Sequence, residues 1–341
     1  MAIINPIVSE SSLVLHPKEK KEMLSIRTEG KKTLARINSS SIGVIQECLR
    51  KTKYSLYDGW RNENEFAATL FGRSIHKALE VFYAGDIERR IIPPLEELLL
   101  IAYGKGKNKE GLIEQAISAF VCSAEPLSSL PDRDKRSVLN GIWILHEYFK
   151  SFKDDPYIAY RDAQGYFLER TFTYRFHEDE DLIIDVFGTI DFAFLNKKTG
   201  NILPGDHKTT SFLGFQDQSY FDREKPNHQY TLYCLAMKEV FGLPFEEFLV
   251  NVIEVKSRPV RETSRGISFP RQITKRNVED FDELREVILD SVDRYLFASK
   301  KDQWPLGGVD ACNKYGGCQF KQICASPKSI RETVLKNKFV R

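Results

Sequence analysis

Residues 165–210 constrain the fold most, because three successive segments show strand periodicity and a turn signal separates the last two. The segments "GYFLERTFTYRF" and "DLIIDVFGTIDFAFLN" alternate in polarity, and "ILPGDHKTT" follows the turn-like "KKTGN". We therefore predict a hairpin in which residues 190–195 pair with residues 202–208. Because side chains alternate across a strand, Asp206 and Lys208 should share one face, and His207 should point to the other.

Helical patterns flank these strands. "NSSSIGVIQECLRKTKY" predicts a Ser-capped helix that carries Cys48, and "FAATLFGRSIHKALEVFYAG" places His76 beside an apolar stripe. After the hairpin, the pattern predicts a helix at 227–242, a strand at 246–256 and a long amphipathic helix at 277–300. This order predicts an α/β fold, with a mixed central sheet flanked by helices.

The composition changes divide the chain into four parts. Residues 1–37 are polar and charged, and we expect a solvated arm or a peripheral helix there. Residues 38–160 form a helical part, 161–300 hold the sheet, and 301–341 form a cysteine-bearing tail, which we expect to pack back on the N-terminal helix.

The charged residues of the hairpin form a candidate catalytic group. If the strands pair as predicted, Asp191, Asp206 and Lys208 converge near one edge of the sheet. Two carboxylates suit Mg²⁺, which activates water and offsets charge on a phosphate, while a lysine stabilises the charge that develops. The alternative is an exposed hairpin with an ion pair, because 48 acidic and 50 basic residues among 341 produce about seven acid-X-base triplets by chance.

Four motifs follow one another along the chain: "GRSIHKALE", "GTIDFAF", "GDHKTT" and "QYTLY". In this order they resemble the histidine motif, G-x-x-D strand, D-x-K strand and Q-x-x-x-Y helix of the RecB-like branch of the PD-(D/E)XK nuclease superfamily. The resemblance spans residues 72–233. It implies a restriction-endonuclease-like fold in which residues 161–300 are the nuclease core.

The resemblance also implies roles for individual residues. The implied ligands of Mg²⁺ or Mn²⁺ are His76, Asp191, Asp206 and the backbone carbonyl of His207. Lys208 would be the catalytic lysine. Gln229 and Tyr233, four residues apart on one helix face, would position the DNA strand.

The assignment of His76 has an alternative in the sequence alone, and two further acids are candidates for the site. An isolated histidine such as His76, beside an apolar stripe, is more often a satisfied core residue than a ligand. Glu169, on the preceding strand, is either an accessory acid of the site or a solvated strand residue. Asp185 has the pattern of a surface acid, but the strand pairing does not exclude it from the site.

The tail contains a cysteine array, "ACNKYGGCQFKQIC", with C-x5-C-x5-C spacing. The alternative of unlinked cysteines is weak, because clustered cysteines in a polar tail are poor core residues. Cys48 is the candidate fourth ligand, because its segment resembles that of the iron-sulfur RecB-like nucleases of the AddB and CRISPR-adaptation exonuclease type. The implied ligands of a [4Fe-4S] cluster are therefore Cys48, Cys312, Cys318 and Cys324.

The identity of this metal centre is open at the sequence level. The related families commonly have C-x2-C-x5-C spacing, whereas the first gap here is five residues, and a four-cysteine zinc site also fits four thiolates. Cys122 and Cys234 lie in apolar helical patterns, and we expect both to be buried thiols.

Bulk properties limit the function. The net charge of +2 restricts any nucleic-acid surface to a local concentration of basic residues. The chain has no apolar run of about 18 residues and its start lacks a signal-peptide pattern, so we expect a cytoplasmic protein without a membrane partner. A Walker A motif is absent from the sequence, so the chain carries no ATP motor of that type.

The resemblance implies a metal-dependent DNA exonuclease of phage-recombination or CRISPR-adaptation type, which acts on single-stranded DNA or DNA ends. A recombinase, a helicase or a CRISPR adaptation protein would be its partner. Two alternatives remain: a structure-specific endonuclease or nickase, and a nucleic-acid-binding regulator that keeps the fold without turnover.

Overall fold

The computed structural model describes residues 24–29, 32–63, 66–104, 111–211, 218–223, 225–244, 246–259, 266–314 and 317–341. The strands are β1 (Leu24–Glu29), β2 (Lys32–Ile37), β3 (Tyr157–Ala159), β4 (Arg161–Asp162), β5 (Gly165–Tyr166), β6 (Leu168–Glu178), β7 (Leu182–Asn196), β8 (Ile202–Thr210), β9 (Glu247–Glu254) and β10 (Arg271–Lys275). The helices are α1 (Ser39–Glu47), α2 (Leu49–Thr52), α3 (Ala67–Ala84), α4 (Leu95–Ala102), α5 (Leu112–Ser123), α6 (Val138–Ser151), α7 (Gln218–Arg223), α8 (His228–Glu239), α9 (Val278–Lys301), α10 (Val309–Asn313), α11 (Lys321–Ala325) and α12 (Arg331–Lys338).

Strand β7 organises the central mixed sheet. The strand order is β1-β2-β7-β8-β9-β10, and β3 and β6 also pair with β7. The β2/β7 and β8/β9 pairs are parallel, and the β7/β8 pair is antiparallel. The predicted hairpin is confirmed, because Phe192 lies opposite Gly205 and Leu195 lies opposite Ile202.

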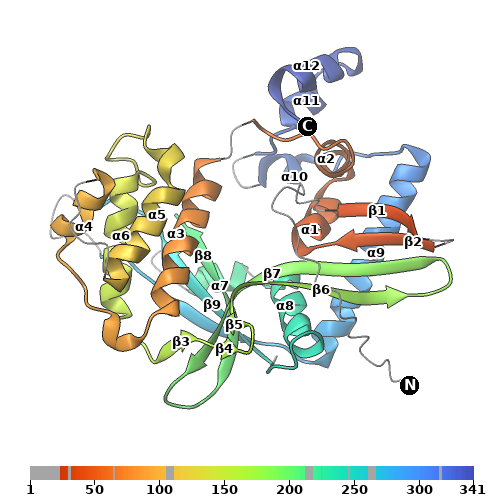
Figure 1. Cartoon of the computed structure of the whole chain (residues 1–341). Coiled ribbons are helices and arrows are strands. Elements are labelled where there is room, and N and C mark those ends of the chain that lie inside the picture. Colours follow the sequence, from red (N-terminus) through yellow and green to blue (C-terminus); the bar gives the residue numbers. More distant parts are fainter. Residues whose placement is uncertain are drawn as a thin grey trace.

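Helices cover both faces of the sheet (Figure 1). Helices α3 to α6 bury their apolar faces against one side of the sheet, where Phe192 and Phe194 of β7 contribute to the core. Helices α1, α8 and α9 pack on the other side, against Val250 and Val252 of β9. Helix α8 is the crossover between the parallel strands β8 and β9. The predicted α/β class, a mixed sheet between helices, is confirmed.

The N-terminal region differs from the expected arm. Residues 1–23 lie outside the described residues, but β1 and β2 form a hairpin, and β2 joins the sheet beside β7. Ala35 and Ile37 are fully buried there. The prediction of an arm or helix was therefore wrong for residues 24–29 and 32–37. The alternation in this segment covers only these two buried residues, which is too few to predict a strand. The partner strand β7 lies about 150 residues further along the chain, so the local sequence does not indicate the pairing.

The helix predicted around Cys48 is interrupted at that residue. Asn38, and not a serine, caps α1: its side chain accepts a hydrogen bond from the Ser41 amide. Cys48 has extended backbone angles and separates α1 from α2, and a π-helical turn follows at Lys53–Tyr57. Cys48 therefore lies at a helix junction, where its sulfur can accept backbone hydrogen bonds.

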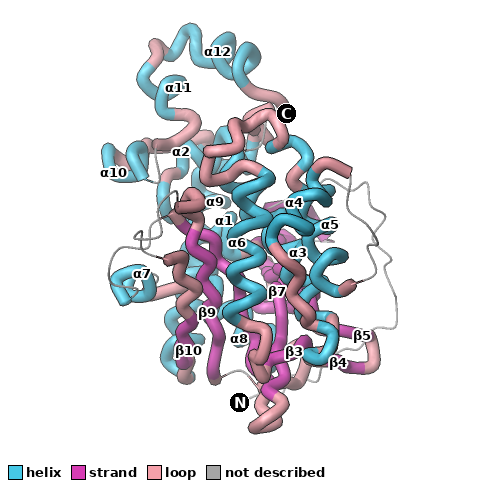
Figure 2. The backbone as a smooth tube through the Cα atoms, turned by 90° about the vertical axis from the view of Figure 1, so that its left-hand side faces the viewer, coloured by secondary structure: helices cyan, strands magenta, loops and turns pink. Residues whose placement is uncertain are grey.

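The cysteine-bearing tail lies against the segment around α2 (Figure 2). The Arg50 amide donates to the Pro305 carbonyl at 3.0 Å, and Arg61 pairs with Val340 through backbone hydrogen bonds. A small apolar cluster joins the two parts: Tyr54, Trp60, Phe320, Ile323, Leu335 and Phe339. Among the described helices, none is long and apolar enough to cross a membrane.

Candidate metal and catalytic site

The β7/β8 register brings the two predicted acidic ligands together. Phe192 faces Gly205, so Asp191 and Asp206 are the next residues along the two strands, and each carboxyl group lies close enough to shift the pKa of the other. The His207 amide also donates to Asp191 Oδ2 at 2.9 Å. A side chain at Gly205 would overlap the Leu249 carbonyl, so glycine allows β8 to pass close to β9 at this point.

Helix α3 adds His76 to these carboxylates. His76 Nδ1 lies 3.3 Å from Asp191 Oδ2, and its Nε2 lies 2.7 Å from the backbone oxygen of His207. A Cβ at Gly72 would lie 2.9 Å from Thr209 Oγ1, so a glycine one turn before His76 lets α3 approach β8. His76 is therefore not an apolar core residue. The His207 carbonyl, a predicted metal ligand, accepts a hydrogen bond from His76 and keeps a second lone pair.

Glu169 on β6 completes a compact group of candidate metal ligands. Its Oε1 lies 3.9 Å from His76 Nδ1, and one ligand atom from each of His76, Glu169 and Asp191 lies within 4.8 Å of the others. Glu169 has a φ of +47°, a left-handed conformation that is uncommon for residues other than glycine. Such strained residues concentrate at functional sites. Asp185, in contrast, lies away from this group and accepts a hydrogen bond from Arg175 Nε at 2.7 Å.

The pKa values of Asp191 and His76 are both raised above their ordinary values. Burial and the neighbouring Asp206 carboxylate raise the pKa of Asp191 well above its ordinary value. Burial lowers the pKa of His76, but Asp191, Glu169 and Asp206 outweigh this effect and raise the pKa to about 9. These shifts favour the protonated forms of Asp191 and His76, because protonation reduces the repulsion between the neighbouring carboxylates.

Lys208 forms an ion pair with Asp206 on the same face of β8. Burial lowers the pKa of Lys208, but Asp206 outweighs burial and raises the pKa above its ordinary value. Burial raises the pKa of Asp206, but Lys208 outweighs burial and keeps the pKa below its ordinary value. Lys208 is therefore an ammonium at neutral pH, which suits electrostatic stabilisation rather than proton abstraction.

Helix α8 holds Lys208 through Gln229. Lys208 Nζ donates to Gln229 Oε1 at 3.2 Å, and Gln229 Nε2 donates to the Tyr233 hydroxyl at 2.9 Å. Tyr233 is 6% exposed, and its ring packs against Phe172. The structure thus brings the predicted Gln-Tyr pair to Lys208, with Tyr233 behind Gln229 and largely away from solvent.

The donor set fits a divalent cation such as Mg²⁺ or Mn²⁺. It combines carboxylate oxygens with one imidazole, which are ligands of hard or borderline cations. Asp206 Oδ2 is buried and accepts no well-aligned hydrogen bond within the described part of the chain, where its contact is the ion pair with Lys208. A cation would satisfy this oxygen and offset the repulsion between Asp191 and Asp206.

The family assignment agrees with this geometry. Residues 36–325 match the family model of the PD-(D/E)XK nuclease superfamily. The chain belongs to this superfamily. A comparison with curated proteins returned no match. Nucleases of the PD-(D/E)XK superfamily typically use Mg²⁺ or Mn²⁺, and membership implies a DNA substrate.

Behind the PD-(D/E)XK motif, a buried polar network holds the His207 side chain. Asn251 Nδ2 lies 2.7 Å from His207 Nδ1, and Arg271 Nε donates to Asn251 Oδ1 at 3.0 Å. Arg271 also donates to Asp155 Oδ2 at 2.6 Å and to the Tyr83 hydroxyl at 2.5 Å. The sequence did not reveal this network, because its members come from five segments of the chain that only the tertiary fold brings together.

The four predicted cluster cysteines lie near one another. Cys48 Sγ accepts hydrogen bonds from the Lys51 amide at 3.5 Å and the Gly307 amide at 3.2 Å. Burial raises the pKa of Cys318, and the nearby thiols of Cys48 and Cys312 add to the increase. Burial also raises the pKa of Cys324, and the nearby thiols of Cys48 and Cys318 add to this increase. In the described residues, these sulfurs do not form a group within 4.8 Å of one another.

The two remaining cysteines differ in environment. Cys234 is buried, and burial raises its pKa to about 12. Cys122 is exposed, so its prediction as a buried thiol was wrong. The buried face of α5 carries Leu112, Ile113, Ala116, Ile117 and Phe120, and Cys122 lies off that face.

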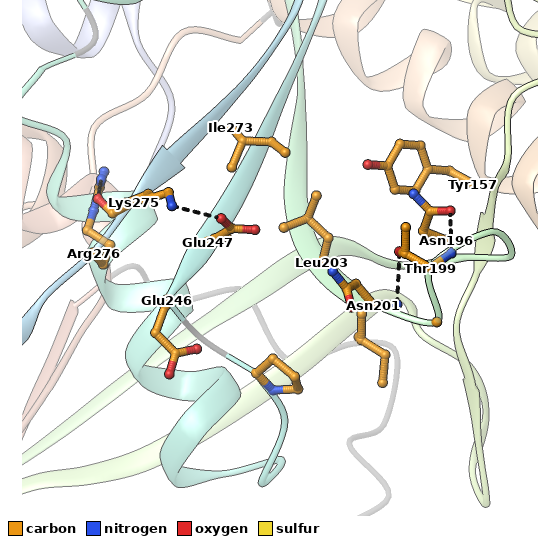
Figure 3. Close-up of a pocket in the computed structure, with 13 residues that line it drawn as sticks. Tyr157, Asn196, Thr199, Asn201, Leu203, Glu246, Glu247, Ile273, Lys275 and Arg276 are labelled. Atoms are coloured by element: carbon orange, nitrogen blue, oxygen red, sulfur yellow. Dashed lines mark hydrogen bonds and ion pairs between the residues drawn. The ribbon is translucent and has the colours of Figure 1, made fainter.

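A cavity of about 500 Å³ lies at the opposite end of β8 (Figure 3). The β7–β8 turn and the adjoining ends of β9 and β10 line it, and Glu247 forms an ion pair with Lys275 at 3.3 Å. The predicted metal ligands and Lys208 do not line this cavity. Its position therefore separates it from the PD-(D/E)XK site.

Replacement of Glu169 by glutamine is expected to weaken Mn²⁺ binding about tenfold, because the variant keeps the side-chain size but removes one negative charge from the ligand group. Isothermal titration calorimetry would measure the Kd for Mn²⁺. Glu178→Gln is the matched control, because Glu178 lies on the same strand but pairs with Lys32 and Arg175. Equal Mn²⁺ affinity in the two variants would remove Glu169 from the site.

Proposed function

We propose that the chain is a Mg²⁺- or Mn²⁺-dependent DNA exonuclease of the RecB-like, iron-sulfur-containing type. One observation carries the proposal: the β7/β8 hairpin brings Asp191 beside Asp206, and Lys208 lies on the same face of β8 as Asp206. His76 approaches the same carboxylates from α3. This arrangement joins all four residues that the histidine, G-x-x-D and D-x-K motifs supply.

In this proposal the acidic group and Lys208 have separate tasks. His76, Asp191, Asp206 and the His207 carbonyl hold the cation, and Glu169 joins them as a further acid. When bound, the cation supplies an activated water and offsets charge on the scissile phosphate. Lys208, as an ammonium, stabilises the negative charge that develops on the phosphate oxygens.

Gln229 and Tyr233 act mainly through Lys208 in this proposal. The Gln229 hydrogen bond limits the positions of the Lys208 ammonium, and Tyr233 fixes the Gln229 amide in turn. Gln229 is half-buried and contributes to positioning the DNA strand from the same helix. Tyr233 is a positioning residue, because its burial favours support of Gln229 over direct contact with DNA.

The four cysteines, in this proposal, bind a [4Fe-4S] cluster with a structural role. A single zinc ion holds its thiolates at about 2.3 Å, which places the sulfurs roughly 4 Å apart. A [4Fe-4S] cluster also takes four thiolates, and the resemblance of the Cys48 segment to that of iron-sulfur RecB-like nucleases favours this cluster over a single zinc ion. Backbone amides that donate to Cys48 Sγ stabilise a thiolate at that position.

A free DNA end is the expected requirement of this enzyme, as distinct from an endonuclease or nickase. With Mn²⁺, linear single-stranded DNA should be degraded to short products, whereas a covalently closed circle of the same sequence should persist. EDTA should stop all cleavage, because it removes the cation. Gel electrophoresis of end-labelled and circular substrates measures both results.

The controls separate the competing functions. Rapid cutting of circles would assign the protein as an endonuclease and leave the metal site intact. Tight DNA binding without cleavage of either substrate would favour a non-catalytic regulator. The exonuclease proposal places the protein in recombination, repair or CRISPR-adaptation processing, with a recombinase, a helicase or an adaptation protein as its partner.

A further inference from the structure

Asn140 joins two basic loops that are distant in the sequence. It lies on α6 and is 5% exposed. Its Nδ2 donates to the Lys135 carbonyl at 2.9 Å and to the Lys256 carbonyl at 2.8 Å, and its Oδ1 accepts from the Arg258 amide at 2.8 Å. One buried amide thus fixes the backbone of residues 135–136 beside that of residues 256–258.

These loops lie next to the end of the strand that carries Lys208. Arg136 Nη2 donates to Ser211 Oγ at 3.0 Å, and Ser211 directly follows β8. Ser211 is three residues beyond Lys208, a distance of roughly 10 Å along a strand. The second loop follows β9, which runs parallel to β8, so both loops lie at the same end of the two strands.

Basic residues outnumber acidic residues in these two loops. Residues 132–136 and 256–258 contain five basic and two acidic residues, in a chain whose net charge is only +2. Asp134, one of the two acids, accepts a hydrogen bond from the Arg136 amide at 2.7 Å. In the described residues, the side chains of Arg136 and Arg258 form no ion pair with a carboxylate, whereas the guanidinium of Arg175 pairs with both Asp185 and Glu178.

We propose that Arg136 and Arg258, held side by side through Asn140, bind the phosphodiester backbone of the nucleic-acid strand beside the scissile phosphate. A guanidinium matches two phosphate oxygens at once and keeps its charge at every physiological pH. Such contacts set the register of the strand without reading its sequence. The inference rests on the proposed function and deepens it, because it names a surface that delivers the strand to Lys208.

The test measures binding of a short labelled single-stranded DNA in EDTA, where cleavage cannot occur. The double variant Arg136→Ala/Arg258→Ala should bind about a hundredfold more weakly at low salt. Each lost phosphate contact should reduce the slope of log K against log salt concentration by about 0.7, so the double variant should lose about 1.4. The loss should be similar for DNA of unrelated sequences.

Two further variants make the test specific. Lys197→Ala/Lys198→Ala removes the same charge from the exposed turn at the other end of the β7/β8 hairpin, and its salt slope should match that of the wild type. Arg136→Lys/Arg258→Lys should restore most of the slope, because it restores the charge. The inference would be overturned if the arginine and lysine alanine variants lost the same amount of affinity and salt slope. It would also be overturned if neither double variant lost any.

Failure of this inference is distinguishable from failure of the proposed function. If the wild type cleaves DNA but the arginine variants keep their affinity and salt slope, only the inference is wrong. If the wild type binds DNA without cleaving it, a reduced slope in the arginine variants still supports the inference, and the nuclease proposal fails alone. A wild type that does not bind the labelled DNA would overturn the inference.

Discussion

Lys208→Ala is expected to cleave DNA at least about a hundredfold more slowly than the wild type while it still binds Mn²⁺. This factor corresponds to about 2.7 kcal/mol of transition-state stabilisation, the scale for the loss of one electrostatic stabiliser. The carboxylates remain in place, so the cation site keeps its ligands. Single-turnover cleavage of labelled DNA and calorimetric titration with Mn²⁺ measure the two properties separately.

The acidic variants should behave differently from Lys208→Ala. Asp191→Ala and Asp206→Ala should lose both Mn²⁺ binding and cleavage, because each removes a ligand oxygen. Lys198→Ala is the matched lysine control, because Lys198 is exposed on the turn of the same hairpin. Normal cleavage by Lys208→Ala would show that "GDHKTT" is not the catalytic element, whatever the metal site does.

Cys312→Ser is expected to lose the iron-sulfur cluster and much of the soluble protein. The wild type, purified without oxygen, should be brown and should contain iron and inorganic sulfide. The variant should be colourless and less stable, on the order of several kcal/mol, because cluster binding is coupled to folding of the tail. The apolar cluster that joins the tail to the α2 segment has only six buried members, so we expect the metal centre to contribute much of the tail's stability.

Cys122→Ser is the control for this experiment, because Cys122 is exposed on α5 and lies outside the cysteine group. It should keep the colour, the iron content and the yield of the wild type. One zinc ion per chain without iron would contradict the iron-sulfur proposal and favour a four-cysteine zinc site. An unchanged iron content in Cys312→Ser would remove Cys312 from the ligand set.

Local patterns in the sequence were sufficient to predict the central elements. The alternation at 182–196 and 202–210 predicted β7 and β8, and the turn between them fixed their pairing, because a short turn leaves few registers. The stripe of Phe71, Ile75 and Leu79 predicted α3, and all three residues are buried. These predictions succeeded because the periodic pattern and the helix or strand that it specifies occupy the same short segment of the sequence.

Contacts between residues that are distant in the sequence could not be predicted in the same way. The β1/β2 hairpin was missed, since its place in the sheet depends on β7, and the exposure of Cys122 depends on which face of α5 the other helices cover. The polar network around Arg271 and Asn251 was missed for the same reason. None of these contacts leaves a periodic signal within its own segment.

The sequence by itself therefore determined the hairpin of Asp191, Asp206 and Lys208, since strand alternation and a short turn place those side chains. Only the tertiary structure decided that Glu169 lies beside His76 and Asp191, and that Asn140 joins the backbone at Lys135 to that at Arg258. The physical reason is that periodicity specifies the face on which a side chain lies, whereas packing of the sheet and helices specifies which faces meet.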